Sequence, residues 1–321
     1  MSRRARRPWL LALASVVAVV AWSRGDAVEV RSGRQAVLEL EGRPCALVED
    51  AGGGDARGDL VLEPPGPDGV VRKHLGGVHY EDIVFDIDLE AVATCPSLQD
   101  WIRDTVRGLK GVRRTGALSE VDAQGRERMR LIFTNATLAE IAFPGLDTAS
   151  RGRAAITLRA TPEVTRRSKG TGVPVPLGRG KSKPWLQSQF RLQLDGLDTR
   201  GVVKIEPFAV RLRLLSGAGP SRDIAKPPGT LDIPNLSLLV SEAFAEPFYA
   251  WHEDFVIRGN SGPDHERNGA VEWLSPGVNG VLGALRLHQV GIVQAVPAPL
   301  GGQTARVQVV LYVERLDFGL K

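Results

Sequence analysis

Four acidic side chains lie in one short segment whose other positions are mostly apolar. In the sequence YEDIVFDIDLE, the acids Asp82, Asp86, Asp88 and Glu90 alternate with the apolar residues Ile83, Phe85, Ile87 and Leu89. Because successive side chains of a β-strand point to opposite faces, this spacing places the acids on one face. Paired carboxylates can catalyse glycoside hydrolysis, but no other reactive group in the chain converges on these four. We therefore interpret them as a solvated surface of a β-sheet.

The other groups that could carry chemistry do not stand at useful spacings. The histidines are His74, His79, His252, His265 and His288, and no two of them make a recognised metal-ligand pair. The sequence HEDFV, which starts at His252, lacks the second histidine of a zinc-protease helix. The GKS of residues 180–182 is similar to a phosphate-binding loop, but Val175 stands where that loop requires its first glycine. The sequence therefore predicts no catalytic, cofactor-binding or metal site.

The excess of positive charge is concentrated at the N-terminus. The chain of 321 residues has a formal net charge of +4 at pH 7. Residues 1–27 contain five arginines and one aspartate, so their net charge equals that of the whole chain. Six further basic residues lie between positions 166 and 183 without an acid, which leaves the remaining segments acidic. A basic surface for specific nucleic-acid binding is therefore not expected.

The N-terminal segment is similar to an export signal. Four arginines precede an apolar run of 15 residues, Trp9–Ser23, which is shorter than the roughly 20 residues needed to cross a bilayer. Such a run, followed by a small-residue site that ends at Ala27, predicts a signal peptide in residues 1–27. An uncleaved anchor, which would be the chain's one contact with a membrane, and a wrongly assigned start codon are the alternatives. Cys45 and Cys95 could form one disulfide after export or remain buried thiols.

Five sequence elements recur in the same order 150 to 154 residues apart. The first pair is AVLELEG, residues 36–42, and FRLQLDG, residues 190–196. The second pair is IVFDIDLE and LSLLVSE, and each member leads into a short amphipathic helix, which is the third pair. Trp101 and Trp251 take the same place in the two helices, and we expect them to anchor each helix on its sheet. The last two pairs bring Leu146 opposite Leu300 and Leu158 opposite Leu311.

This recurrence indicates a duplication. The expected organisation is a signal peptide or anchor in residues 1–27, a first domain in 28–165, a basic Pro/Gly-rich linker in 166–184 and a second domain in 185–321. Each domain has the pattern of a strand, a long hairpin, a strand, one short helix, a hairpin and a final strand. The predicted fold class is mainly β (α+β), with two tandem antiparallel β-barrels or sandwiches that each carry one short helix.

The stretch IFTNATLAEIAFPGLDTASRGRAAITLRATPE and the helix before it resemble a known family. A strand ends in an Asn-Ala pair, a segment with a proline and a leucine follows, and a polar turn leads into the last strand. The positions that carry this pattern are Phe133, Asn135, Ala136, Pro144 and Leu146, with Trp101 at the centre of the helix. The first domain resembles the tail tube proteins of contractile phages, which are related to the tubes of extracellular contractile injection systems and of type VI secretion. In the second domain, His288 and Gln289 replace the Asn-Ala neighbourhood and only the pattern remains.

The resemblance implies an assembly. Members of this family form rings of six barrels whose sheets join into one inner wall, and the rings stack into a hollow tube. Two fused domains imply that three chains complete a ring, so the expected partner is the chain itself, with other tail or baseplate proteins as further partners. The hairpins Asp50–Gly77 and Pro207–Gly229 would contact the next ring along the axis. The acids Asp82, Asp86, Asp88 and Glu90 would face the lumen and repel passing DNA.

The sequence thus predicts a non-enzymatic structural subunit of a phage-tail-like tube that needs no cofactor. The alternative is an exported two-domain β-sandwich binding or adaptor protein that keeps the tube fold without polymerising. An enzyme that uses the acidic strand is a third interpretation. The family resemblance suggests a particle assembled in the cytoplasm, whereas the N-terminal segment suggests export to the periplasm or the cell exterior.

Overall fold

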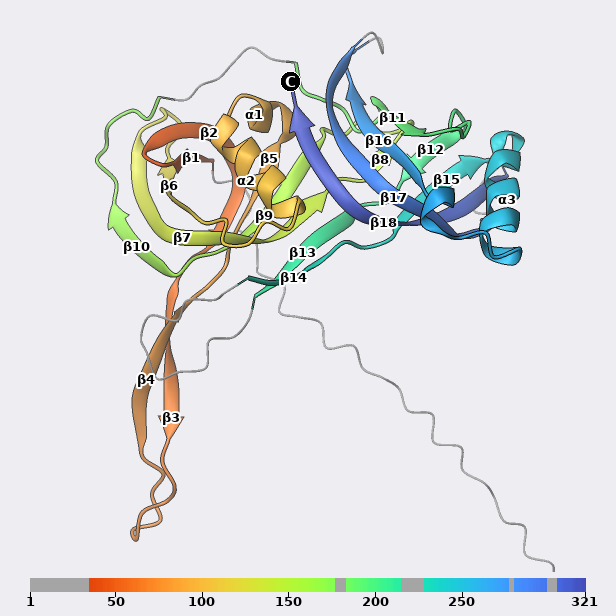
Figure 1. Cartoon of the computed structure of the whole chain (residues 1–321). Coiled ribbons are helices and arrows are strands. Elements are labelled where there is room, and N and C mark those ends of the chain that lie inside the picture. The colour runs from red at the N-terminus through yellow and green to blue at the C-terminus, as the bar shows by residue number, and fades with distance from the viewer. Residues whose placement is uncertain (1–34, 177–182, 215–227, 277–279, 299–304) are drawn as a thin grey trace, which may run out of the picture.

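The computed structural model describes residues 35–176, 183–214, 228–276, 280–298 and 305–321 (Figure 1). Its strands form a closed six-stranded barrel in the N-terminal half of the chain and a seven-stranded half-barrel that comes mostly from the C-terminal half. Short helices accompany both sheets. The mainly β fold class expected from the alternating sequence pattern is therefore confirmed.

The first barrel closes through its longest strand. Its strands are β1 (Ala36–Leu40), β2 (Arg43–Gly53), β5 (Ile83–Asp88), β6 (Arg114–Val121), β7 (Glu127–Phe143) and β9 (Ala155–Thr161). They are antiparallel and follow the order β7-β6-β1-β2-β5-β9, and β9 pairs again with β7. Closure of this kind leaves a barrel without an open edge. The alternation in β5 places Ile83, Phe85 and Ile87 in the barrel core, where each is at most 1% exposed.

A local break in the backbone lets β7 serve two neighbours. Asn135 has a positive φ of 51°, and most residues before it pair with β6, whereas those after it pair mainly with β9. Asparagine tolerates this left-handed conformation better than most residues do. The Asn135 N–H donates to the Thr115 hydroxyl at 3.2 Å. The second long strand, β17 (Val281–Pro297), has a similar break at Gln289, whose φ is 55° and whose N–H donates to the Asn268 side chain at 3.3 Å.

The second sheet stays open. Its strands follow the order β11 (Phe190–Leu194), β16 (Arg267–Leu274), β17, β18 (Arg306–Leu320), β15 (Leu236–Ser241), β12 (Val202–Ile205) and β8 (Leu146–Asp147). From β16 to β12 this order of pairing matches the barrel's order β6-β7-β9-β5-β2. Within the described residues β11 does not pair with β12, whereas in the barrel β1 pairs with β2. The outer side of β12 is taken instead by β8, which comes from the N-terminal half.

Helical segments follow β5 and β15. They are α1 (Leu89–Ala93), α2 (Pro96–Val106), η1 (Glu242–Phe244), α3 (Glu246–His252), η2 (Glu253–Ile257) and η3 (Pro263–His265). The first half has two short helices where the sequence analysis expects one. The break falls at Cys95, whose extended backbone, with φ of −120° and ψ of 94°, is the conformation favoured before a proline. Trp101 in α2 and Trp251 in α3 are buried, at 0% and 5% exposure.

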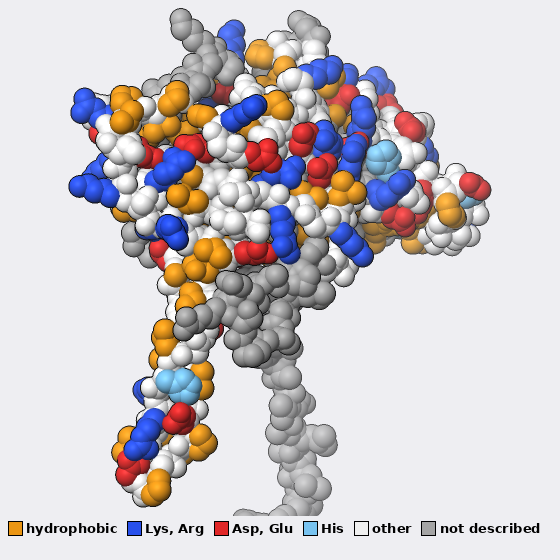
Figure 2. All heavy atoms as spheres, turned by 60° about the vertical axis from the view of Figure 1, so that its left-hand side comes forward, with side chains coloured by type: hydrophobic (Ala, Val, Ile, Leu, Met, Phe, Trp, Pro, Cys, Tyr) orange, Lys and Arg blue, Asp and Glu red, His pale blue; other side chains and the backbone are white. Residues whose placement is uncertain are grey.

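Each half also extends a hairpin before β5 or β15. The hairpins consist of β3 (Ala56–Leu62) and β4 (Lys73–Tyr80) in the first half, and of β13 (Phe208–Leu214) and β14 (Pro228–Asp232) in the second. The β3–β4 hairpin is a separate two-stranded sheet that projects from the barrel, with apolar side chains along it (Figures 1 and 2). In the second hairpin, β13 pairs with β7 of the same chain. Residues 215–227 of this hairpin lie outside the described residues, so the contact with the next ring that the sequence analysis expects stays a prediction.

Two segments set apart by the sequence analysis are described only in part or not at all. Residues 1–27 lie outside the described residues, so the export signal stays a prediction. The predicted linker, residues 166–184, begins inside β10 (Val164–Lys169), which pairs with the first part of β7. Its first basic residues, Arg166 and Arg167, therefore belong to a strand of the first sheet.

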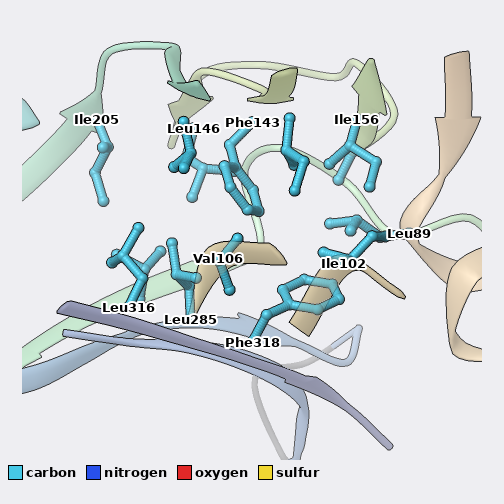
Figure 3. Close-up of a cluster of buried hydrophobic side chains, with 14 of the residues drawn as sticks. Leu89, Ile102, Val106, Phe143, Leu146, Ile156, Ile205, Leu285, Leu316 and Phe318 are labelled. Carbon is cyan, nitrogen blue, oxygen red and sulfur yellow. The ribbon is translucent and has the colours of Figure 1, made fainter. Parts of the chain in front are cut away.

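One apolar core runs through both halves, and α2 lies within it. Figure 3 shows Ile102 and Val106 of this helix among side chains of the two sheets, which include Phe143, Leu146, Leu285, Leu316 and Phe318. Each of these side chains is at most 3% exposed. Complete burial of one such side chain contributes about 1.5–3 kcal/mol. The contact between the halves is therefore packed like a protein interior.

Candidate functional site

The polar face of β5 is paired with β9. The hydroxyl of Thr161 donates to Asp82 at 2.7 Å, and the hydroxyl of Thr157 donates to Asp86 at 2.5 Å. Both acids lie opposite the apolar face that fills the barrel core. These carboxylates accept hydrogen bonds from the neighbouring strand, as in other cross-strand pairs. Their position facing a lumen stays a prediction.

The next two acids share one cation. An Arg153 guanidinium nitrogen contacts Asp88 and lies 3.7 Å from Glu90 Oε1. Burial raises the pKa of Asp88, and the positive charge of Arg153 opposes that shift. With Cys45, these three residues line part of a surface hollow of about 620 Å³. Because the single positive charge of Arg153 is shared by both acids, this arrangement fits a structural ion-pair cluster.

Among the described residues, the other candidate groups are not brought together into a metal site. In the part of the chain that the structure describes, no three His, Cys, Asp or Glu side chains lie close enough together to hold a metal ion. No helix among the described residues is long and apolar enough to span a membrane. The GKS motif of residues 180–182 lies outside the described residues.

The residues of the family motif surround the bend and the end of β7. Phe133 and Ala136 are buried in the barrel, and Asn135 is exposed at the bend between them. Pro144 is partly buried after the end of β7, and Leu146 is buried in β8. The motif therefore leads from the wall of the first barrel into a strand that pairs with the other half of the chain.

The contact between the halves has three parts, and the first is a pair of strands. β13 runs antiparallel to the end of β7, from Phe208 opposite Phe143 to Arg211 opposite Glu140. The Phe143 and Phe208 rings stack with centroids 5.0 Å apart. Arg211 Nε donates to Glu140 Oε2 at 3.0 Å. In such strand addition, backbone hydrogen bonds supply affinity and side-chain pairs fix the register.

The second part joins the short strand β8 to β12. Leu146 lies opposite Ile205, and Asp147 lies opposite Lys204. The Thr148 N–H extends this pairing and donates to a backbone oxygen of the second half at 3.0 Å. Because β11 does not reach β12 among the described residues, β8 satisfies an edge that the second half leaves open.

The third part is the packing of α2 on β18. Beside the apolar contacts of Figure 3, the Arg107 guanidinium donates to both Asp317 oxygens, at 3.0 and 2.7 Å. These hydrogen bonds lower the pKa of Asp317. The Gln99 side-chain oxygen accepts a hydrogen bond from the Leu320 N–H at 3.2 Å. The sequence analysis misses the Arg107–Asp317 pair because the two residues are 210 positions apart and neither belongs to a motif.

A buried polar cluster at the start of β7 is a second feature that sequence reasoning misses. The Ser119 hydroxyl donates to Glu127 Oε1 at 2.6 Å, Arg130 donates to the same oxygen at 3.1 Å, and the Thr171 N–H donates to Oε2 at 3.0 Å. Burial disfavours the charged carboxylate, but these hydrogen bonds outweigh it and lower the pKa of Glu127 to about 2. The cluster therefore holds a buried charge that ties together strands of the first sheet.

The two cysteines are joined. The disulfide links Cys45 in β2 to Cys95, the residue before α2, with the Cα atoms 5.3 Å apart. The sequence leaves open a disulfide or two buried thiols, and the structure contains the disulfide. The link ties the start of α2, the helix at the centre of the contact, to the first barrel.

Comparisons with known proteins give weak structural matches. No protein-family model and no curated protein matches the sequence. A chain of the PVC sheath-tube complex, an extracellular contractile injection system, is 15% identical, and the match covers 42% of this chain and 88% of that chain with a TM-score of 0.36. The tube-terminating cap of the anti-feeding prophage is 16% identical, with 48% and 99% covered and a TM-score of 0.36. A PVC sheath/tube terminator is 17% identical, with 42% and 93% covered and a TM-score of 0.35.

The chain thus resembles structural components of contractile injection systems.

Proposed function

We propose that the chain is a structural, non-enzymatic subunit that joins end to end with further copies of itself. The two halves would be repeats of one unit, three chains would supply the six units of a ring, and rings would stack into a tube. The contact between the halves is the observation that supports this proposal. It joins a front surface of the first half, made by α2, the end of β7 and β8, to a back surface of the second half, made by β18, β12 and β13.

Among the described residues, the front of the second half and the back of the first half have no such cover. Val106, at the end of α2, is 1% exposed between the halves. Val256 and Ile257, which follow α3 at the corresponding place, are 42% and 64% exposed. Apolar side chains gathered in this way favour a contact with another protein surface.

A contact between two different surfaces of one unit can repeat indefinitely. Such a heterologous contact closes into a ring when the rotation between units divides a full turn, and gives a filament when it does not. The contact already formed inside the chain would set this rotation for the contacts between chains. Other tail or baseplate proteins would then bind at the ends of a stack.

The disulfide favours one kind of cellular compartment for the protein. The bond between Cys45 and Cys95 favours an oxidising compartment, such as the periplasm or the cell exterior. It agrees with the export signal predicted in residues 1–27, and it also favours the second candidate, an exported binding or adaptor protein that does not polymerise. The state of association separates the two candidates.

Light scattering and negative-stain class averages of the purified, oxidised chain test the proposal. Across the micromolar range we expect trimers that appear as rings with pseudo-sixfold symmetry, some of them stacked. A species that stays monomeric throughout this range contradicts the proposal and favours the binding protein. A closed ring of six chains would support self-assembly but contradict the prediction that three chains complete a ring.

A further inference from the structure

We infer that β3 of one chain adds as a new strand to the free edge of β17 in the next chain. The inference rests on the proposed function and names the surfaces that would join two copies. Its template is inside the chain, where β13 adds to the edge of β7. The partner is therefore a second copy of this chain.

The first argument is that the two hairpins occupy the same place in the two halves. Arg57 in β3 lies opposite His79, four residues before β5 begins. Arg211 in β13 lies opposite Asp232, four residues before β15 begins. Arg57 and Arg211 therefore correspond in register, but only the second hairpin has a strand against its outer edge among the described residues.

The second argument is the character of the β3–β4 hairpin. Six of the 14 exposed large apolar side chains in the described residues belong to it: Leu60, Val61, Leu62, Val70, Val71 and Leu75. Figure 2 shows hydrophobic side chains along an arm that projects from the body of the protein. A long, exposed and apolar strand edge is a site for pairing with another chain.

The third argument is that one edge of β17 is unpaired near its C-terminal end among the described residues. This segment pairs with β18 on one edge, whereas β16 begins at Arg267, opposite Val290, so the other edge has no strand from there to Pro297 among the described residues. Val293 at this edge is 44% exposed. The matching stretch of β7 has β9 on one edge and β13 on the other. The front of the second half thus lacks one strand that the front of the first half has.

An alignment of β7 with β17 predicts which residue of β3 would lie opposite which residue of β17. Glu140 lies five residues after the break at Asn135, and Gln294 lies five residues after the break at Gln289. The pairing with the next strand shifts at the same place in both, before Glu140 and before Gln294. Because Arg211 lies opposite Glu140 inside the chain, Arg57 of one copy should lie opposite Gln294 of the next.

Cysteine cross-linking tests this register. The full-length variant with Arg57→Cys and Gln294→Cys should form disulfide-linked dimers and trimers on a non-reducing gel at concentrations where rings form. Both side chains are exposed, so folding should not depend on them. The matched control is Arg72→Cys with Gln294→Cys, which places the first cysteine in the distal loop of the same hairpin and should give no ladder.

Charge substitutions at the same position supply a second readout. Gln294→Glu would give Arg57 the acidic partner that Arg211 has in Glu140, although Arg57 already contacts Glu81 within its own chain. We expect Gln294→Glu to tighten association by up to about fivefold and Gln294→Lys to weaken it by a similar factor. The double variant Arg57→Glu with Gln294→Lys should restore the association that Gln294→Lys weakens.

The outcomes separate the inference from the proposed function. Rings that form normally, without the specific cross-link and without a response to the charge at position 294, overturn the inference and leave the ring proposal standing. A chain that stays monomeric at all concentrations overturns both.

Discussion

The two halves pair their strands in nearly the same order but satisfy their edges in different ways. The first half closes its barrel by pairing β1 with β2 and β7 with β9. The second half leaves β11 and β12 unpaired with each other among the described residues, and β12 is completed by β8 from the first half. The first half is therefore complete as a barrel, whereas the second depends on its neighbour. One arrangement of strands can thus be either a finished domain or one that needs a partner.

The two hairpins also differ in how their strand edges are paired. β13 is held against β7 by a ring stack and an ion pair, whereas β3 has only β4 beside it among the described residues. Among the described residues, the outer edge of β13 is therefore paired and that of β3 is not. The following predictions test how far the two halves differ in stability.

The largest effect is expected at the helix that both sheets enclose. Trp101→Ala should lower the free energy of unfolding by about 3–5 kcal/mol, because the ring is 0% exposed in α2. Trp251→Ala should lie at the lower end of that range, because α3 is not covered by a second sheet and its tryptophan is 5% exposed. Urea unfolding followed by circular dichroism measures both. Leu109→Ala, at a side chain that is 51% exposed, is the control and should change little.

The next effect concerns the disulfide, which occurs only in the first half. Replacing both Cys45 and Cys95 by serine should lower the free energy of unfolding by about 2–4 kcal/mol, since the bond closes a loop with a separation of 50 residues. Hydrogen exchange should show faster opening in β2 and α2 and little change in β16 and β17. An equal increase in exchange rate in both halves would contradict this prediction and would mean that the two halves unfold together.

The smallest effect is a pH dependence that comes from Glu127 in the first half. The pKa of Glu127 is lowered from 4.5 to about 2, so its stabilisation is fully present above about 4.5 and is lost as the pH falls toward 2. Glu127→Gln should cost about 1–3 kcal/mol at pH 7, and the difference from the wild-type chain should shrink between pH 4.5 and 2. Glu63→Gln, at a side chain that is 52% exposed, is the matched control. A difference that stays constant down to pH 2 would contradict this account.

The alternating sequence pattern was enough to predict the class of fold and the burial expected on each face of a strand. Ile83, Phe85 and Ile87 fill the core of the first barrel because period-two alternation is a local property that the chain keeps in any sheet. The helices around Trp101 and Trp251 were predictable for a similar reason. Their apolar stripes and early prolines lie within a few residues of each other.

The contact between the halves could not be predicted in this way. Its strand pairs join residues about 60 to 70 positions apart, such as Phe143 with Phe208, and the Arg107–Asp317 pair spans 210 positions. The local sequence does not show which hairpin docks and which projects, because both β3 and β13 contain polar and apolar residues. The outcome depends on which strand edge lies nearby in the folded chain.

The outward face of β5 and its counterpart in the second half have different chemical characters. β5 presents Asp86 and Asp88, whereas β15 presents Ser237, Leu239 and Ser241 in the same alternation. If these faces line a channel built from three such chains, acidic and uncharged sectors would alternate around its circumference. The electrostatic potential of the wall would then have threefold symmetry although the backbone is close to sixfold. A cargo inside would meet three repelling stripes separated by three neutral tracks.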